Sequence, residues 1–191
     1  MQLINLNKEK KKEVKFSKPG DYIIFFYNVS GKFTFDLAAS GINLDIFGLF
    51  IGKNAKEFSL ETVQNHKYPA STSNLLIKGV FRDKSKFNYK GLIRIEKKAQ
   101  KSHAYQKNQN LILSPDVFVE SKPYLEILAN DVFCTHGSTT GKLNEEEIFY
   151  LKSRGFSEKA ATSLLIDGFI QDLFAKIKEK KGDFKFDYTD A

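Results

Sequence analysis

One stretch of the chain decides its fold: Ile77-Lys-Gly-Val-Phe-Arg-Asp-Lys-Ser-Lys-Phe-Asn-Tyr-Lys-Gly-Leu-Ile-Arg-Ile95. It begins and ends in an apolar cluster, and further clusters follow at Leu113 and Ile127, at intervals of 14 to 18 residues. Such an interval is too long for a two-residue hairpin, and no helical pattern lies between the clusters. It is typical of a solenoid whose coils each add two or three short strands to stacked parallel sheets.

Strand-like sequence extends upstream from this stretch. Three segments rich in β-branched and aromatic residues follow one another and are separated by glycines: Tyr22–Tyr27, Lys32–Leu37 and Asn43–Phe47. An antiparallel β-sandwich with a turn about every 8–12 residues produces a similar pattern. Periodicity alone therefore predicts a mainly β core and leaves the β-helix and the β-sandwich open.

Composition limits the class of protein. The chain has 191 residues, a formal net charge of +7 and one cysteine. This length suits one domain, a single cysteine excludes an intrachain disulfide, and no apolar stretch could span a bilayer, so we expect a cytoplasmic protein without a membrane partner. Much of the positive charge sits in the terminal runs Lys8–Lys12 and Lys176–Lys181, which are more often solvated than bound.

Helical signals replace strand signals after residue 142. Asn144 and Glu147 have the spacing of a capping box, and Gly155 is suited to end a helix in the left-handed region. Ser157 then caps a second helix, predicted to run to about Lys180. The chain is divided accordingly into a basic amino-terminal segment (1–20), a β core (21–142), a helical region (143–181) and a tail (182–191).

The second predicted helix carries two apolar stripes. One is Ala161, Leu165, Phe169 and Leu173, and the other is Ile166, Ile170, Phe174 and Ile177. Such a helix packs on two sides, either within its own domain or against its domain and a partner. Two helices joined at Gly155 also suggest a DNA-binding helix-turn-helix, but Asp167 and Asp172 do not suit a recognition helix, so we expect no nucleic-acid partner.

The chemical hypothesis rests on Cys134 and His136 in Asp131-Val-Phe-Cys-Thr-His-Gly137. If Leu125 to His136 is a strand, residues i and i+2 face the same side, and thiol and imidazole project together as soft ligands for iron or zinc. Two ligands do not complete a site, so a metal would need residues from another chain. The alternative is a small buried cysteine with a histidine beside it by coincidence.

Enzyme motifs are absent from the sequence. It has no glycine-rich phosphate loop, no Gly-x-Ser-x-Gly and no Cys-x-x-Cys. His66 falls in a loop-like stretch and is predicted to be exposed, and His103 is predicted to be a surface residue. The alternative function is a carbohydrate-binding or carbohydrate-active β-helix, which would use carboxylates along one face. No pair stands out among the candidates Asp116, Glu120, Glu126 and Asp131.

A series of motifs in fixed order resembles one protein family. The motifs are Lys78–Ser85, Gly91–Ile95, Ala99–Gln106, Asn108–Ser114, Ser121–Ile127, Cys134–Gly137 and Phe149–Gly155. Over about the last two thirds of the chain they resemble the core of the SufB/SufD family, the scaffold subunits of the Suf iron–sulfur cluster assembly system. The resemblance implies a right-handed parallel β-helix. Cys-x-His-Gly is similar to the SufD type, since the SufB type usually has an acidic residue where Gly137 stands.

The resemblance also implies roles for the candidate ligands. Cys134 and His136 match the region where SufB and SufD subunits meet and where a nascent cluster is thought to be held. They are therefore candidate ligands of a transient iron–sulfur cluster, shared with a SufB-like partner or with a second copy of this chain. The family's usual amino-terminal helical region and the upstream cysteine of SufB-type subunits have no counterpart in the sequence. We expect a scaffold and not an enzyme.

The carboxy-terminal helices of the family dock the SufC ATPase. By resemblance, the partner-binding residues here are Phe149, Tyr150, Arg154, Gly155 and Phe169. Tyr and Arg are favoured at interfaces because each combines a large contact area with a polar group. Phe149 and Tyr150 could instead cap the end of the β-helix, which solenoids require. We expect one of these two neighbours to face inward and the other to face a partner.

Overall fold

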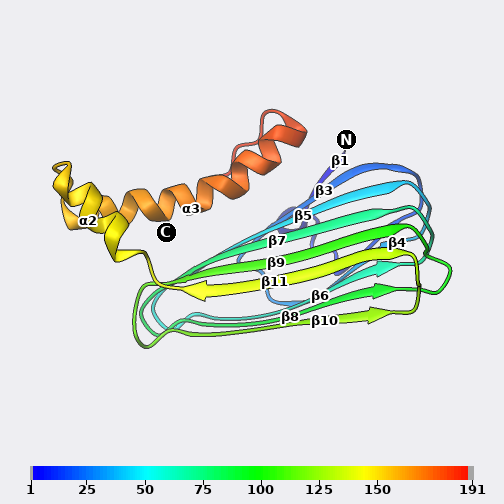
Figure 1. Ribbon diagram of the computed structural model, residues 1–191, viewed down its shortest axis with the longest axis horizontal. Coiled ribbons are helices and arrows are strands. Elements are labelled where there is room, and N and C mark those ends of the chain that lie inside the picture. The colour runs from blue at the N-terminus through cyan, green and yellow to red at the C-terminus, as the bar shows by residue number, and fades with distance from the viewer. Residues whose placement is uncertain (1, 189–191) are drawn as a thin grey trace.

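The computed structural model describes residues 2–188, in which two parallel sheets face each other as a β-helix (Figure 1). The six-stranded sheet has the order β1-β3-β5-β7-β9-β11, and the five-stranded sheet has the order β10-β8-β6-β4-β2. The elements are β1 (Gln2–Asn5), α1 (Leu6–Glu9), β2 (Glu13–Phe16), β3 (Gly20–Tyr27), β4 (Gly31–Leu37), β5 (Ile42–Gly52), β6 (Glu57–His66), β7 (Thr72–Phe81), β8 (Lys86–Ile95), β9 (Ser102–Ile112), β10 (Phe118–Ile127), β11 (Val132–Gly141), α2 (Glu145–Ser153) and α3 (Glu158–Lys181). The predicted parallel β-helix is confirmed, and the β-sandwich is excluded because every strand pair is parallel.

Successive coils stack with matched registers. Ile46 pairs with Leu75, Leu75 with Gln106 and Gln106 with His136, which are steps of 29, 31 and 30 residues. Each coil gives one strand to each sheet, so the apolar interval of 14 to 18 residues in the sequence corresponds to half a coil. Alternate residues of each strand point into the solenoid, and those between them point outward.

The interior of the early coils, which are built from β1 to β8, is mostly apolar and aromatic. Phe50 and Phe87 have ring centroids 4.7 Å apart, and Phe81 stacks on Phe87 at 5.1 Å. Gly48 and Gly79 leave room for these rings, since a Cβ at Gly48 would lie 2.3 Å from the Phe26 ring and one at Gly79 would lie 2.3 Å from the Phe81 ring. The close approach of aromatic rings to the backbone therefore requires glycine at both positions.

In the later part of the stack, from β9 onward, the interior becomes polar. Gln106, Asn108 and Asn110 are buried on β9, and Asn110 Nδ2 donates to Asn108 Oδ1 at 2.7 Å. The same Asn110 amide donates to Thr140 Oγ1 on β11 at 3.2 Å. A buried amide ladder of this kind holds the coils in register, because every group left unpaired would carry a desolvation cost.

His66 is fully buried at the end of β6, which corrects the prediction that it is exposed. Gln64 and His66 alternate with the outward-facing Asn65, so the stretch is a strand despite its loop-like composition. His66 Nε2 lies 2.7 Å from Ser73 Oγ, which also accepts from Gln64 Nε2 at 2.7 Å. Burial lowers the pKa of His66 to about 4, because the imidazolium form would lose its solvation.

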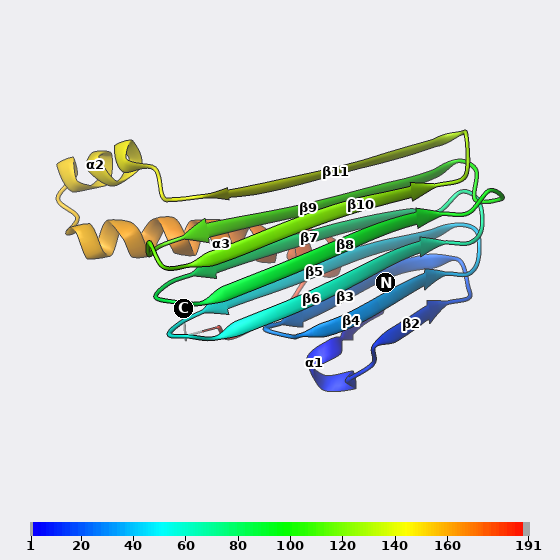
Figure 2. The same ribbon diagram turned by 90° about the horizontal axis from the view of Figure 1, so that it is seen from below.

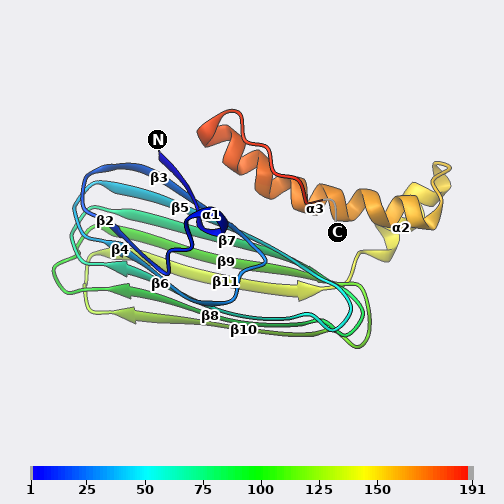
Figure 3. The same cartoon turned by 180° about the vertical axis from the view of Figure 1, so that it is seen from behind.

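The sheets begin earlier than the predicted core boundary at residue 21. β1 pairs with β3, and β2 pairs with β4. Ile4, Leu6, Val14 and Phe16 are buried in the interior cluster, because apolar residues flank the lysine run on both sides. α1 lies at the amino-terminal end of the solenoid (Figure 3), where Leu6 closes the first coil.

The carboxy-terminal helices begin at the predicted caps. Asn144 Oδ1 accepts a hydrogen bond from the Glu146 backbone N–H at 2.9 Å, and Ser157 Oγ accepts one from Ala160 at 3.2 Å. Gly155 has a φ of +93°, a value that side-chain-bearing residues rarely adopt, and separates the two helices. No helix within residues 2–188 is long and apolar enough to cross a membrane.

α3 covers the outer face of the six-stranded sheet at its amino-terminal side (Figure 1). Its buried residues in this layer are Ile170, Leu173, Phe174 and Ile177, which pack with outward-facing residues of β3, β5 and β7. Both predicted stripes therefore contribute to one broad face within the domain. The segment after α3 folds back over the same layer, and Phe184 and Phe186 contact the Phe25 ring at 5.1 and 4.8 Å.

Candidate functional site

The candidate site lies in the last coil of the solenoid. β10 and β11 are edge strands, because each pairs with only one neighbour in the described part of the chain. Figure 2 shows them at the end of the stack opposite α1 and β2. Leu125 to His136 is not one strand, as the sequence suggested, because a corner separates β10 from β11. Gln100 Oε1 fixes this corner by accepting from the backbone N–H groups of Asn130 and Asp131 at 3.2 and 2.9 Å.

Cys134 and His136 nevertheless share one face of β11. Cys134 pairs with the buried Ala104 and His136 with the buried Gln106, which places both side chains in the inward-facing row. Cys134 is half-buried against a small apolar cluster of Ile93, Ile95, Ala99, Ala104 and Ala129. His136 is exposed. The predicted side-by-side projection of thiol and imidazole therefore matches the strand geometry.

Burial against this cluster raises the pKa of the Cys134 thiol to about 11. The isolated chain therefore carries a protonated thiol at neutral pH, and metal binding would have to release that proton. No group of three or more His, Cys, Asp or Glu side chains within residues 2–188 is arranged to hold a metal ion. Cys134 and His136 can supply two ligands, and the other ligands of a metal or cluster would have to come from a second molecule.

Large apolar side chains surround the open coil. The exposed ones are Tyr124, Leu125, Ile127, Leu128 and Phe133, with Phe133 71% exposed. Phe133 points to the outer face of β11. Its one ring contact among the described residues is with His103, with ring centroids 5.0 Å apart. Edge strands with unpaired backbone groups and apolar side chains are typical of a surface that pairs with another chain. We call these five exposed residues the apolar frame, which was not predicted from the sequence. Its signal was that Tyr124–Ile127 has large apolar residues at both inward and outward positions of β10.

The carboxylates proposed for the carbohydrate alternative form no catalytic arrangement. Glu120 lies on the outer face of β10 and pairs with Lys122 at 2.7 Å. Glu126 lies on the same face and is 3.6 Å from Arg94. These side chains pair with basic neighbours on a solvated face and do not flank a cleft, as a pair of glycosidase carboxylates would.

A second surface is formed by α2 and the start of α3. Phe149 is 74% exposed and Tyr150 is 56% exposed, and α2 has no buried residue. The expectation that one of these neighbours faces inward is therefore wrong, because α2 projects beyond the strand ends and does not pack on the last coil (Figure 1). The Arg154 guanidinium lies over the Tyr150 ring, 5.2 Å from its centroid, and orients it.

A groove of about 350 Å³ separates the two helices at this surface. Its lining includes Tyr150 and Leu151 of α2 and Leu164 and Leu165 of α3. Leu164 is exposed and was not recognised from the sequence. Phe169 does not belong to this surface, because it is half-buried against the sheet with the Lys78 ammonium 4.3 Å from its ring centroid.

The chain resembles known proteins over most of this architecture. A sequence model described as "SUF system FeS cluster assembly, SufBD core domain" matches residues 27–169, from β3 into α3. The chain belongs to the SufB/SufD family. The matched region contains both Cys134 with His136 and the groove between α2 and α3.

Individual members of the SufB/SufD family show the same similarity. The chain is 35% identical over 115 residues to the iron–sulfur cluster assembly protein SufD of Escherichia coli, a match covering 60% of this chain and 27% of that protein. It is 33% identical over 129 residues to a SufBD family protein of Synechocystis, covering 68% and 28%. A third match, to a SufBD family protein of Mycobacterium leprae, has 30% identity over 145 residues and covers 72% and 37%. The chain therefore spans between about a quarter and two fifths of these relatives and is SufD-like.

Proposed function

We propose that this chain is a non-enzymatic, cytoplasmic scaffold subunit of iron–sulfur cluster assembly. The observation that carries the proposal is the position of Cys134 and His136 in one inward-facing row of β11, in a coil with two unpaired edges. Family membership supports the chemistry, since the matched family and its named relatives are described by iron–sulfur cluster assembly.

The cluster would be held between two molecules. One thiolate and one imidazole are half of the four ligands that a cluster normally requires. A SufB-like partner, or a second copy of this chain, would pair with the edges of β10 and β11, cover the exposed apolar frame and add the remaining ligands. An imidazole ligand and a site divided between subunits suit a cluster that is assembled and then passed on.

The helical surface would bind a SufC-type ATPase. Its exposed aromatic residues Phe149 and Tyr150, the adjoining Arg154 and the apolar groove reaching Leu164 combine features of protein-binding hot spots. Gly155 holds the turn between the two helices, and Phe169 holds α3 on the sheet, so both would support this surface without touching the partner.

The cluster proposal is tested by anaerobic reconstitution with iron and sulfide, with and without SufB-like and SufC-like partners. We expect visible absorption and bound iron only in the assembled oligomer, and loss of most of both in Cys134→Ala and in His136→Ala. His103→Ala, on the exposed outer face of β9, is the control for loss of a histidine and should keep the wild-type iron content per assembled oligomer; iron is compared per oligomer because the His103 ring contacts Phe133. If the oligomer forms and its iron content ignores Cys134→Ala and His136→Ala, the pair is structural and the proposed ligand role fails.

The docking proposal is tested by titrating a SufC-type ATPase into the protein in a calorimeter. Tyr150→Ala and Leu164→Ala should each weaken the Kd by about tenfold or more, the effect usual for residues at the centre of an interface. Ser163→Ala is the control, because Ser163 is exposed beside Leu164 and does not line the groove. Equal affinities for all three variants and wild type would place the docking surface elsewhere.

A further inference from the structure

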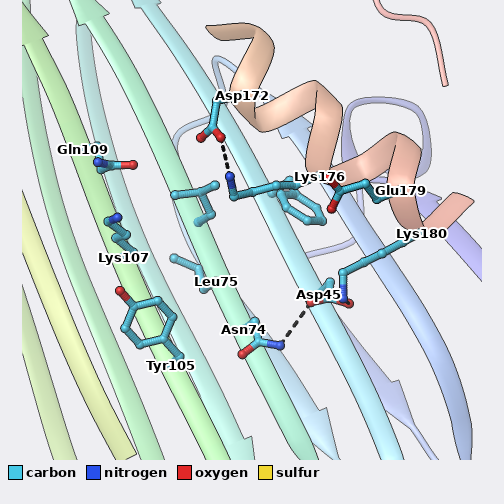
Figure 4. A pocket seen from close by; sticks show the side chains of 12 residues that line it. Asp45, Asn74, Leu75, Tyr105, Lys107, Gln109, Asp172, Lys176, Glu179 and Lys180 are labelled. Carbon is cyan, nitrogen blue, oxygen red and sulfur yellow. Dashed lines mark hydrogen bonds and ion pairs between the residues drawn. The ribbon is translucent and has the colours of Figure 1, made fainter. Parts of the chain in front are cut away.

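A second concave surface lies further along α3 than the groove at Leu164 and Leu165, between the helix and the outer face of β5, β7 and β9 (Figure 4). It has a volume of about 360 Å³, within the range of small-molecule sites. The groove exists because α3 covers β3, β5 and β7, while the apolar layer beneath it reaches β9 only at Leu111. The lining of this groove does not include Cys134 or His136, so ligand binding there is independent of cluster binding.

The floor of the groove is apolar, and one wall is polar. Phe47 and Leu76 are buried side by side, in a register row that continues to Lys107 on β9. Tyr105, Lys107 and Gln109 are alternate, outward-facing residues of β9 and form the wall across from α3 (Figure 4). Within residues 2–188, the side-chain polar atoms of these three residues have no hydrogen-bond or ion-pair partner.

Two ion pairs between α3 and the sheet, Lys78–Asp172 and Lys180–Asp45, hold the helix side of the groove in place. Lys78 donates to Asp172 at 2.7 Å, and Lys176 pairs with the same carboxylate. Lys180 pairs with Asp45 at 2.7 Å, and Asn74 also donates to Asp45 at 3.1 Å. Asp172 and Lys180 lie about two helical turns apart, so α3 is fixed to the sheet at two points along the groove.

The same ion pairs leave Lys107 as the lysine of the lining that has no ion-pair partner among the described residues. Both aspartates are already paired, so they do not compete for the ammonium group of Lys107. The lining has three carboxylates, Asp45, Asp172 and Glu179, and three lysines, Lys107, Lys176 and Lys180. The Lys78 ammonium group adds a further positive charge, but it is buried against Asp172 and does not line the groove. An anionic group at the β9 wall would therefore meet the unpaired ammonium group of Lys107 beside an apolar floor.

We propose that this groove binds a small planar organic anion. Its ring would lie over Phe47 and Leu76 beside Tyr105, and its anionic group would bind Lys107, with the Gln109 amide as a second donor. The volume suits an aromatic acid of one or two rings. An extended peptide fits less well, because β7 and β9 each pair on both sides and offer no unpaired backbone to it.

The test uses indole-3-acetate and its neutral isostere indole-3-acetamide as probes, titrated at low salt into protein with labelled Leu methyl groups. We expect the Leu76 methyl resonances to shift and the carboxylate to bind about fivefold more tightly than the amide, as expected for one partly exposed ion pair. Lys107→Gln should remove this preference and leave indole-3-acetamide binding unchanged. Tyr105→Ala should weaken both probes, and Glu179→Gln should strengthen the carboxylate alone.

Lys90→Gln is the control, because Lys90 is an exposed lysine on the outer face of the other sheet. Indole-3-acetate binding as tight in Lys107→Gln as in wild type would overturn the proposal. So would the absence of Leu76 shifts with either probe. An acidic peptide that shifts Leu76 when indole-3-acetate does not would identify a peptide groove and overturn it too.

Discussion

The two ends of the solenoid differ in what they bury and in what they expose. At the amino-terminal end, α1 closes the first coil with Leu6, α3 covers the outer sheet face, and the interior is packed with phenylalanine rings. At the carboxy-terminal end, β10 and β11 have unpaired edges, and apolar residues such as Phe133 are exposed. The early coils therefore bury the apolar residues that stabilise the fold, while the last coil leaves strand edges and apolar side chains exposed among the described residues.

The interior changes in the same direction along the stack. The coils up to β8 bury aromatic rings as far as Phe87 and Tyr89, whereas β9 buries Gln106, Asn108 and Asn110. His66 and Ser73 are buried polar residues within the aromatic coils. Several of these polar atoms, including Gln64 Oε1, His66 Nδ1 and Gln106 Oε1, have no protein partner. Buried polar atoms without protein partners are usually satisfied by ordered water, so we expect hydration beside these residues inside the solenoid.

The largest expected effect is on stability in the early coils. Phe87 is fully buried among Phe50, Phe81 and Tyr89, so Phe87→Ala should lower the free energy of unfolding by about 3–5 kcal/mol. Phe133→Ala removes the same ring from an exposed position and should change it by no more than about 0.5 kcal/mol in the isolated chain. Urea denaturation measures both, and similar losses would break the distinction between the two ends.

Much of the fold could be predicted from the sequence. The apolar interval from Ile77 to Ile127 corresponds to successive half-coils, but it left a β-sandwich open, and the resemblance to the SufB/SufD family decided for the parallel β-helix. The helix caps at Asn144 and Ser157 are local hydrogen-bonding signals and were predictable for that reason. The first coil was missed, because a lysine run hides the alternation of Val14 and Phe16.

Of the candidate site, only the shared face of Cys134 and His136 could be predicted from the sequence. Cys134 and His136 are two residues apart on one strand, and that relation can be derived from strand geometry alone. The burial of His66 and the exposure of Leu164 depend on which elements pack together, and no local pattern reports this. The groove beside Lys107 arises because α3 returns to the sheet some 60 residues after β9, a relation visible only in the folded chain.

An intermediate effect is expected on the pH dependence of stability, through His66. Its pKa is about 4 in the folded chain because of burial, against about 6.5 when unfolded. Below pH 6.5 the unfolded chain binds a proton that the folded chain does not, so stability falls as the pH is lowered from about 6.5 to 4. One such group accounts for about 2–3 kcal/mol over this interval.

Urea denaturation between pH 7 and pH 4 should show this loss in wild type. His66→Gln should flatten the profile, because it removes the group that titrates while retaining a hydrogen-bonding side chain beside Ser73. His103→Gln, an exposed histidine on β9, should leave the profile as in wild type. A profile unchanged by His66→Gln would show that the polar surroundings of His66, namely Gln64 and Ser73, accommodate the imidazolium and that burial does not hold its pKa low.

The smallest of these effects concerns how α3 is held on the early coils. Lys78 is almost fully buried and donates to Asp172 and to the Phe169 carbonyl, each at 2.7 Å. Asp172→Ala leaves this ammonium group without its counterion, and the buried position makes that unfavourable. Because Asp172 itself is about half exposed and the carbonyl contact persists, the expected loss is about 1–2 kcal/mol and not the larger cost of a fully buried pair.

The double variant Lys78→Met with Asp172→Ala should recover most of that loss, because no charge is then left buried and Met fills the space beside Phe169. Lys176→Ala is the control, since it removes only the exposed partner of the same carboxylate and should cost less than about 0.5 kcal/mol. Chemical denaturation of Lys78→Met, Asp172→Ala, their double variant, Lys176→Ala and wild type gives the coupling between Lys78 and Asp172. A coupling near zero would mean that the apolar layer alone fixes α3, and the two ion pairs beside the groove would then be consequences of docking and not its cause.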